Sequence, residues 1–153
     1  MTGLERGQLS VMRIHAAIFG GVVLAAATGA NAVLLATLAV PMGTVIIPVA
    51  LLLAYPVLLG PPRRFRAWRY GTGDQELRVQ HGVVVQVQTV VPFGRVQHID
   101  VAQGPIERSF GVARLVLHTA GTANSEVVLP GLSRATAEGL RDEIRAHIRQ
   151  DPA

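Results

Sequence analysis

The sequence predicts an α+β membrane protein: a hairpin of two transmembrane helices, then a curled β-sheet or barrel of about six or seven strands, capped by a C-terminal α-helix. Three observations support this fold class. A long apolar run lies near the N-terminus, polar and apolar residues alternate after it, and apolar residues recur at helical spacing near the end. Hydrophobic residues make up 50% of the 153 positions and charged residues 16%, with a mean hydropathy of +0.38. Soluble domains average about 25% charged residues, so a membrane segment is expected.

The apolar run covers residues 14–62, which include no Asp, Glu, Lys or Arg. At about 1.5 Å per residue it would form roughly 73 Å of helix, whereas the hydrocarbon core of a bilayer is about 30 Å thick. The run therefore fits two crossings, and Pro41 and Gly43 favour a break between them. We expect helices over residues 14–38 and 44–60, preceded by a cytoplasmic N-terminal segment of residues 1–13.

Arginines flank this hairpin on both sides, while the turn between the helices is uncharged. Because positively charged flanks favour the cytoplasm, we expect a multi-pass protein of the bacterial inner membrane with both termini cytoplasmic. Residues 63–70 form a basic and aromatic juxtamembrane segment. Its aromatic rings suit the headgroup level, and its cations suit an anionic surface. The candidate membrane-surface residues are Arg63, Arg64, Arg66, Trp68 and Arg69.

The N-terminus also resembles a secretory signal peptide. Arg6 and Arg13 precede an apolar stretch, and Ala30-Asn31-Ala32 matches an A-x-A cleavage site. Because the apolar run continues to Pro62, we favour a first transmembrane helix over a cleaved signal.

The net charge of +4 and the isoelectric point near 11 suggest a nucleic-acid partner, but the distribution of charge argues against one. From residue 70 to 153 there are eight arginines and nine acidic residues. Strong binding to phosphates needs a basic stripe on the folded domain. The excess positive charge instead follows the apolar run directly, so we expect the lipid bilayer as the partner and no nucleic acid.

The sequence lacks the residue patterns of catalytic and metal-binding sites. The chain has no cysteine, which excludes disulfides, thiol nucleophiles and Cys-ligated metals. The histidines have no metal-ligand spacing, no G-x-S-x-G motif occurs, and the acidic residues are scattered. We therefore expect no enzyme activity, no catalytic residues, no metal and no cofactor. The histidines are His15, His81, His98, His118 and His147.

Residues 71–153 are expected to form one cytoplasmic β-rich domain. Residues 75–80 alternate, a turn follows at His81-Gly82, and residues 83–91 are rich in β-branched side chains, so the two predict a hairpin. A further strand is expected over residues 95–101, and a second hairpin over 113–119 and 126–129 with its turn at 120–124. Ser133 suits the N-cap of the final helix. The apolar stripe of that helix consists of Ala137, Leu140, Ile144 and Ile148.

Two stretches of the domain carry ordered motifs. Residues 89–113 read TVVPFGRVQHIDVAQGPIERSFGVA, and residues 115–121 read LVLHTAG. With the two apolar helices and the Arg/Trp/Tyr junction, they resemble the YdbS-like family of bacterial membrane-flanked domains. The resemblance implies a pleckstrin-homology-like (PH-like) fold and a membrane-anchored accessory or scaffold role beside a larger protein with several copies of the domain. It implies no enzymatic activity and no cofactor. Phe93-Gly94 departs from the family pattern, in which a leucine and a longer side chain are usual.

The two signatures, P-x-x-R-V-Q and Q-G-P-I-x-R-x-F-G, supply the candidate binding residues. One interpretation is a partner surface or small-ligand groove, to which an exposed edge strand could add. The other is structural: Phe110 fills the core, Arg108 pairs internally, and Gly104 and Gly111 supply special backbone angles. The candidates are Arg95, Gln97, His98, Gln103, Arg108 and Phe110.

Together these observations predict a non-enzymatic, membrane-anchored PH-like interaction or scaffold module of a bacterial inner-membrane complex, with a connection to envelope stress. The expected partner is a larger membrane protein with related PH-like domains, and self-association is a further expectation. The alternative is a lipid or small-ligand sensor at the cytoplasmic leaflet.

Overall fold

The computed structural model describes residues 1–38, 41, 43–120 and 126–150. For residues 149 and 150 it describes the backbone alone. The chain forms two compact units. One combines Met1–Val11 with Arg64–Ala153, and the other is Met12–Arg63. The helical unit is therefore inserted between two parts of the β-rich unit.

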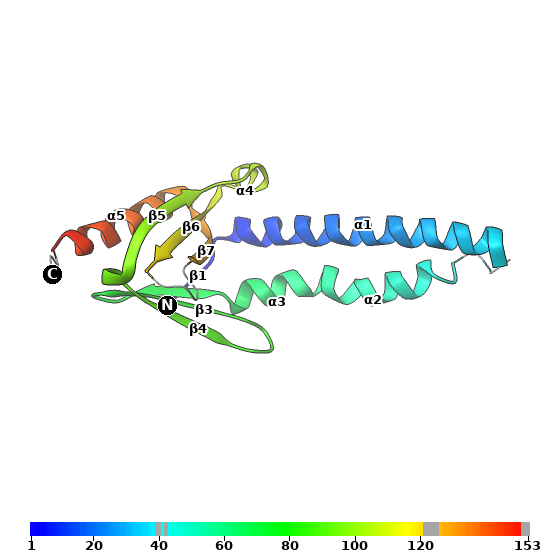
Figure 1. The fold of residues 1–153 in the computed structure, drawn as a ribbon, viewed down its shortest axis with the longest axis horizontal. Helices are drawn as coiled ribbons and strands as arrows, with labels where there is room; N and C mark the ends of the chain where they lie inside the picture. The colour runs from blue at the N-terminus through cyan, green and yellow to red at the C-terminus, as the bar shows by residue number, and fades with distance from the viewer. Residues whose placement is uncertain (39–40, 42, 121–125, 151–153) are drawn as a thin grey trace. The chain divides into compact units, whose positions relative to one another are not determined.

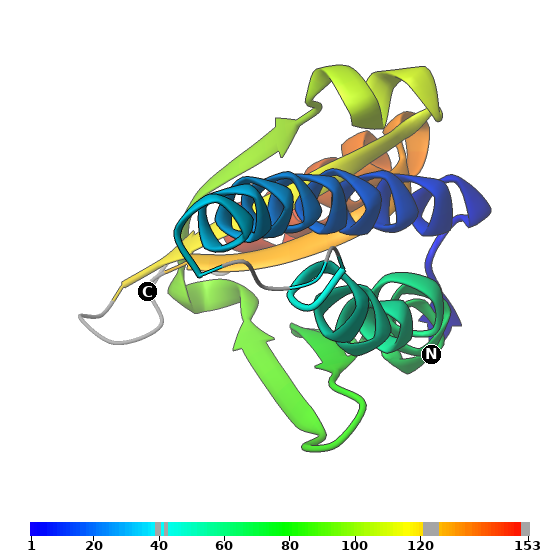
Figure 2. The same cartoon turned by 90° about the vertical axis from the view of Figure 1, so that its right-hand side faces the viewer.

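The apolar run folds into helix α1 (Arg6–Leu38) and helix α2 (Ile46–Leu58), which continues after Leu59 into α3 (Gly60–Ala67). Figures 1 and 2 show α1 and α2 side by side. Arg6–Leu38 and Ile46–Ala67 are both long and apolar enough to cross a membrane. The second helical segment ends at Ala67, beyond the expected residue 60, because Pro61 and Pro62 occupy the first turn of α3, where no intrahelical N–H bond is lost.

A polar contact fixes the two helices at their turn. Asn31 is buried on α1, and its side-chain oxygen accepts a hydrogen bond from the backbone N–H of Val45 at 3.1 Å. Val45 is the N-cap of α2, and its N–H would otherwise need another partner. Asn31 therefore satisfies one end of α2 in a segment where unpaired polar groups are costly.

In the part of the chain that the structure describes, seven antiparallel strands form two sheets, as predicted for a curled sheet capped by a helix (Figures 1 and 2). One sheet has the order β1 (Thr2–Gly3), β2 (Arg69–Thr72), β3 (Glu76–His81) and β4 (Val87–Pro92). The other has the order β5 (Val96–Ala102), β6 (Val112–Thr119) and β7 (Glu126–Ser133). A 3₁₀ turn, η1 (Phe93–Arg95), joins β4 to β5, and a short helix, α4 (Pro105–Ser109), joins β5 to β6. The turn predicted at 120–124 lies outside the described residues, except for Ala120.

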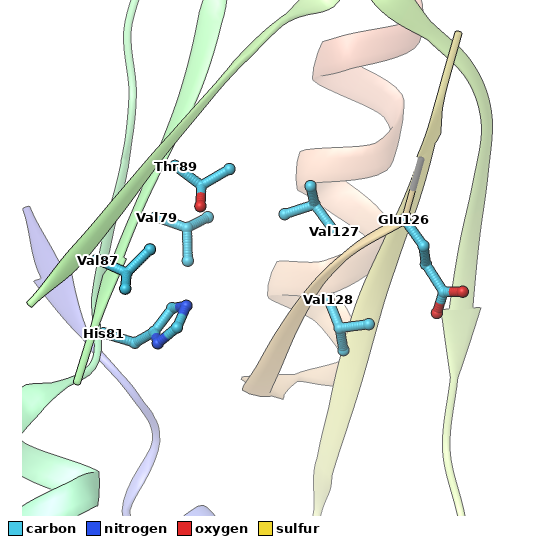
Figure 3. Close-up of a pocket in the computed structure, with 7 residues that line it drawn as sticks. All are labelled: Val79, His81, Val87, Thr89, Glu126, Val127 and Val128. Carbon is cyan, nitrogen blue, oxygen red and sulfur yellow. The ribbon is translucent and has the colours of Figure 1, made fainter. Parts of the chain in front are cut away.

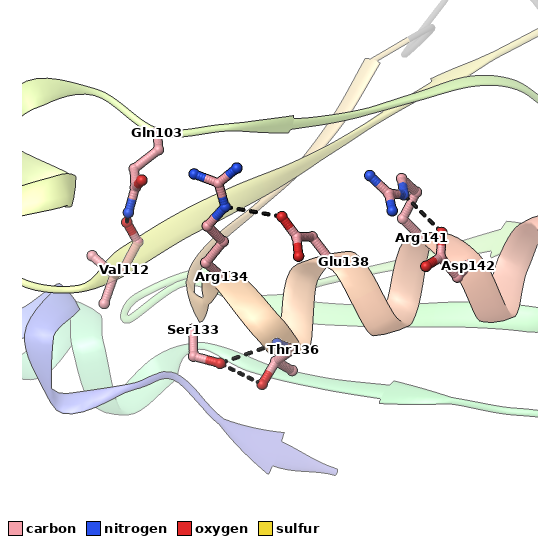
Figure 4. Close-up of polar contacts among 8 residues, drawn as sticks. All are labelled: Gln103, Val112, Ser133, Arg134, Thr136, Glu138, Arg141 and Asp142. Atoms are coloured by element: carbon pink, nitrogen blue, oxygen red, sulfur yellow. Dashed lines mark hydrogen bonds and ion pairs between the residues drawn. The ribbon is translucent and has the colours of Figure 1, made fainter.

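Helix α5 (Arg134–Gln150) covers the inner side of the second sheet. The predicted N-cap is confirmed, because the Ser133 hydroxyl accepts the Thr136 N–H at 3.0 Å (Figure 4). Arg141 donates to Asp142 on the exposed side at 2.9 Å, and this hydrogen bond lowers the pKa of Asp142. The buried core brings this helix together with both sheets: Leu77, Val79, Leu115, Leu117, Leu129, Leu132, Ala137, Leu140 and Ile144.

The N-terminal residues complete the β-rich domain, which differs from the separate segment expected for residues 1–13. Thr2 pairs with Tyr70 across β1 and β2, and the Glu5 N–H donates to the Gly131 carbonyl at 2.8 Å. A Cβ at Gly7 would lie 2.4 Å from the Phe110 carbonyl oxygen, so glycine permits close packing there. Burial raises the pKa of Tyr70, and the nearby charge of Glu5 raises it further.

The phenylalanine expected to fill the core is exposed, and a different phenylalanine is buried. Phe93 is 2% exposed and packs its ring 5.3 Å from the ring of His147 on α5. Phe110 is 39% exposed, so the interpretation that it fills the core is wrong. The α4 turn is held instead by buried Glu107, which accepts the Gly104 N–H at 2.6 Å.

Of the other residues in the structural interpretation, Gly111 has the expected backbone conformation, whereas Arg108 and Gly104 differ from expectation. Arg108 is exposed, and Glu107 has Arg114 as its ion-pair partner at 4.0 Å. Gly111 has a φ of +66°, which favours glycine, whereas Gly104 has an ordinary φ of −76°.

The different burial of Phe93 and Phe110 predicts different costs for truncating each ring to alanine. Phe93→Ala removes a buried ring and should lower the free energy of unfolding by about 3–5 kcal/mol. Phe110→Ala should cost about 1 kcal/mol or less, because the ring is already partly hydrated. Denaturant unfolding of the full chain in detergent micelles, followed by fluorescence of Trp68, the single tryptophan, measures both. Equal costs would contradict the assignment of Phe93 to the core.

Candidate functional site: an open cleft between the sheets

Within the described residues, the interior of the β-rich domain is open at one end, between the β3–β4 hairpin and the start of β7. The cleft there has a volume of about 230 Å³. Figure 3 shows Val127 projecting across the gap toward Val79 and Thr89, whereas the Glu126 carboxylate points away. Valines dominate the lining, which consists of Val79, His81, Val87, Thr89, Glu126, Val127 and Val128.

The position of α5 explains why the described elements leave this end uncovered. In β4, Thr89 and Val91 face inward with Val87, but only Val91 is buried. Helix α5 covers the interior near Phe93 with Ile144 and other apolar residues, at the end of β4 away from Val87. Val87 is left 42% exposed although it lies on the inner face. The cleft is thus the part of the core that no described element covers.

An aromatic stack forms one rim of the cleft. The rings of Trp68 and His81 lie 4.7 Å apart, with 23° between their planes. Trp68 follows α3 directly, and His81 ends β3. The stack therefore holds the basic segment against the hairpin that lines the cleft.

The size and chemistry of the cleft limit what it can hold. Drug-sized ligands occupy pockets of about 300–1,000 Å³, so a space of about 230 Å³ suits one or two side chains of a partner better than a whole small molecule. Among the described residues, the polar side-chain groups that line it are the His81 imidazole and the Thr89 hydroxyl, since the Glu126 carboxylate points away. An apolar segment that extends along β4 or β7 fits this lining, because within the described residues each of these strands is paired on one side.

The first signature lies elsewhere, on the outer face of the second sheet. His98 on β5 lies opposite His118 on β6, and both contact Asp100: His98 Nε2 at 2.8 Å and His118 Nε2 at 3.4 Å. All three side chains are exposed, so these ion pairs contribute little to stability. This cluster does not form a metal site: among the described residues, no group of three or more His, Cys, Asp or Glu side chains is arranged to hold a metal ion. Sequence spacing missed this cluster because the two histidines meet only across strands.

The structure does not bring all six candidate binding residues together. Three of them, Arg95, Gln97 and His98, are exposed at the start of β5. Arg108 and Phe110 are exposed at α4, which follows the other end of β5. At about 3.3 Å per residue, the length of β5 separates them by roughly 20 Å. Gln103 is a structural residue, since its amide donates to the Val112 carbonyl at 2.9 Å (Figure 4).

The candidate membrane-surface arginines are exposed. Arg63, Arg64 and Arg66 lie on α3, and Arg69 begins β2. Arg63 also donates to the Tyr55 hydroxyl, with its guanidinium 5.0 Å from the centre of that ring. Trp68 is half-buried against His81 rather than free.

Comparison with known proteins places this fold in a family. The model of the Bacterial PH domain family matches residues 17–148. Transmembrane protein YdbS of Bacillus subtilis is 36% identical over 88 residues, which cover 58% of this chain and 54% of YdbS. Transmembrane protein YdbT of the same organism is 26% identical over 82 residues, covering 53% of this chain and 17% of YdbT.

The matched stretch thus spans about half the length of YdbS and a much smaller share of YdbT. No solved structure matches the chain. The family match covers most of the chain, and two helices are long and apolar enough to cross a membrane. The chain belongs to the Bacterial PH domain family, as a YdbS-like, membrane-associated member.

Proposed function

We propose that this protein is a non-enzymatic, membrane-anchored interaction module whose open cleft accepts an apolar segment of a larger membrane protein with related PH-like domains. The single observation that carries the proposal is the valine-lined cleft of about 230 Å³ beside two strands that are each paired on one side. Such a site binds by main-chain hydrogen bonds and by a few apolar side chains. Its small volume favours a partner segment over a free small molecule.

The relatives support the choice of partner. YdbS and YdbT occur in the same organism, and the segment similar to this chain is only 17% of YdbT. One organism therefore has both a YdbS protein and a longer protein with a related segment. The proposal includes self-association as a second use of the same cleft. It also includes a role in envelope-stress defence, which deletion should reveal as sensitivity to membrane-damaging agents.

We propose further that the protein lies in the inner membrane with both termini cytoplasmic. Residues 1–11 and 64–153 belong to one folded unit, so both ends of the helical hairpin must emerge on the same side of the bilayer. The arginines at these ends favour the cytoplasmic side. Protease added outside intact spheroplasts should leave the β-rich domain uncut, and cleavage within residues 64–153 would contradict this orientation.

Two valines of β4 allow a matched test of partner binding. Val87 lines the cleft and is 42% exposed, whereas Val90 is 45% exposed on the opposite face of the strand. Val87→Glu should reduce partner recovery at least tenfold, because a carboxylate covered by the partner loses its water. Val90→Glu should leave recovery unchanged. The measurement is affinity isolation of the full chain in mild detergent, with the partner identified by mass spectrometry.

The control is thermal unfolding, since the two variants should lose similar stability in a strand of similar exposure. Equal recovery from both variants, or isolation of the wild-type chain alone, would contradict the proposal.

A second candidate function is sensing of anionic lipid at the cytoplasmic leaflet. Exposed Arg66 and Arg69 flank Trp68 and favour it. In nanodiscs, anionic lipid should change the Trp68 fluorescence of the full chain, and Arg66→Gln with Arg69→Gln should abolish the change. Arg108→Gln with Arg145→Gln removes the same charge from exposed sites elsewhere and should have no effect. A response equal in neutral lipid would count against sensing.

A further inference from the structure

The loop that joins β3 to β4 exposes three consecutive valines. Val83, Val84 and Val85 are 48%, 95% and 72% exposed. The β-branched run from residue 83 to 91 predicts a strand throughout, but β4 begins only at Val87. These valines therefore contribute neither to the sheet ladder nor to the core. A run of three exposed apolar residues is unfavourable in water unless it has a binding role.

The backbone of this loop is specifically shaped. His81 pairs with Val87, so residues 82–86 make the whole connection. Gly82 has a φ of +109°, and a Cβ there would lie 1.9 Å from the Val85 carbonyl oxygen. Only glycine permits this tight turn. The turn holds the valines outward at the tip of the hairpin instead of letting them extend the strands.

The loop lies beside the basic segment that leads out of the second apolar helix. The residue before Gly82 is His81, whose ring stacks on Trp68 at 4.7 Å. Trp68 follows α3, which bears exposed Arg64 and Arg66 within the same folded unit. In Figure 1 the β3–β4 loop lies at the end of the β-rich domain where α3 leads into β2.

We infer that Val83–Val85 is a membrane wedge, which enters the headgroup–acyl boundary of the bilayer. An apolar loop joined by the His81–Trp68 stack to a basic segment matches this boundary, which is apolar below and anionic above. The chain itself brings the loop to the membrane surface. Arg64 follows directly on residues 46–63 of the second candidate span, and Trp68, four residues later, stacks on His81 at the base of the loop. The wedge would fix the orientation of the β-rich domain on the membrane. The inference rests on membrane association and does not require partner binding.

The absence of cysteine allows a direct test with single labels. Val84→Cys carries an environment-sensitive fluorophore at the loop tip. Gly94→Cys is the matched control, because Gly94 lies past the far end of β4 and is exposed. An added Cβ there would lie more than 4 Å from any described residue other than its two chain neighbours. Neither change should disturb folding. The full chain is placed, one copy per disc, in nanodiscs of phosphatidylglycerol and phosphatidylethanolamine.

The label at position 84 should emit at shorter wavelength than the label at 94. Its quenching by aqueous iodide should be at least threefold weaker, and lipid-attached nitroxide should quench it strongly. Val83→Asp with Val85→Asp should return the label at 84 to the behaviour of the label at 94. Equal iodide quenching at both positions would overturn the inference. Protection from iodide without nitroxide quenching would also overturn it, because protein rather than lipid would then cover the loop.

Discussion

The pairing of the N-terminal residues with the strand that follows the hairpin is the constraint on which the rest of the structure depends. Thr2 pairs with Tyr70, and the Glu5 N–H bonds to the Gly131 carbonyl, so residues far apart in sequence close the same domain. The chain leaves this domain at Val11 and returns at Arg64. Two covalent connections therefore join the β-rich domain to the apolar helices. The helical segment is thus an insertion in the β-rich domain, and both of its ends continue into the same folded unit.

Sequence patterns predicted the parts of this fold that depend on local physics. The uncharged run matches the two long apolar helices, and the alternation in β3 and the stripe on α5 reflect burial of one face. Ser133 caps α5 with its own hydroxyl. The N-terminal strand was missed because two residues, Thr2–Gly3, show no periodicity. Its existence depends on the position of β2, which lies 66 residues or more away in sequence.

The candidate site was harder to predict, for the same reason. Val79, Val87 and Val127 look like ordinary strand valines, and only the incomplete cover of the interior turns them into a cleft. His98 and His118 meet because β5 and β6 pair. The burial of Phe93 and Phe110 could not be predicted from the local sequence, since each directly precedes a glycine. Their different burial follows from α5, which covers Phe93 and leaves Phe110 at the α4 turn.

The cleft and the valine loop share one hairpin, and this links the two proposals. Val87 lines the cleft, and Val84 stands three residues away at the tip, within about 10 Å along the chain. A tip held at the headgroup level therefore keeps the mouth of the cleft close to the membrane surface. A partner that reaches it must be held at the same surface, which favours a membrane protein over a soluble one. Confinement to this layer also raises the effective concentration of such a partner, so a small cleft can suffice for stable association.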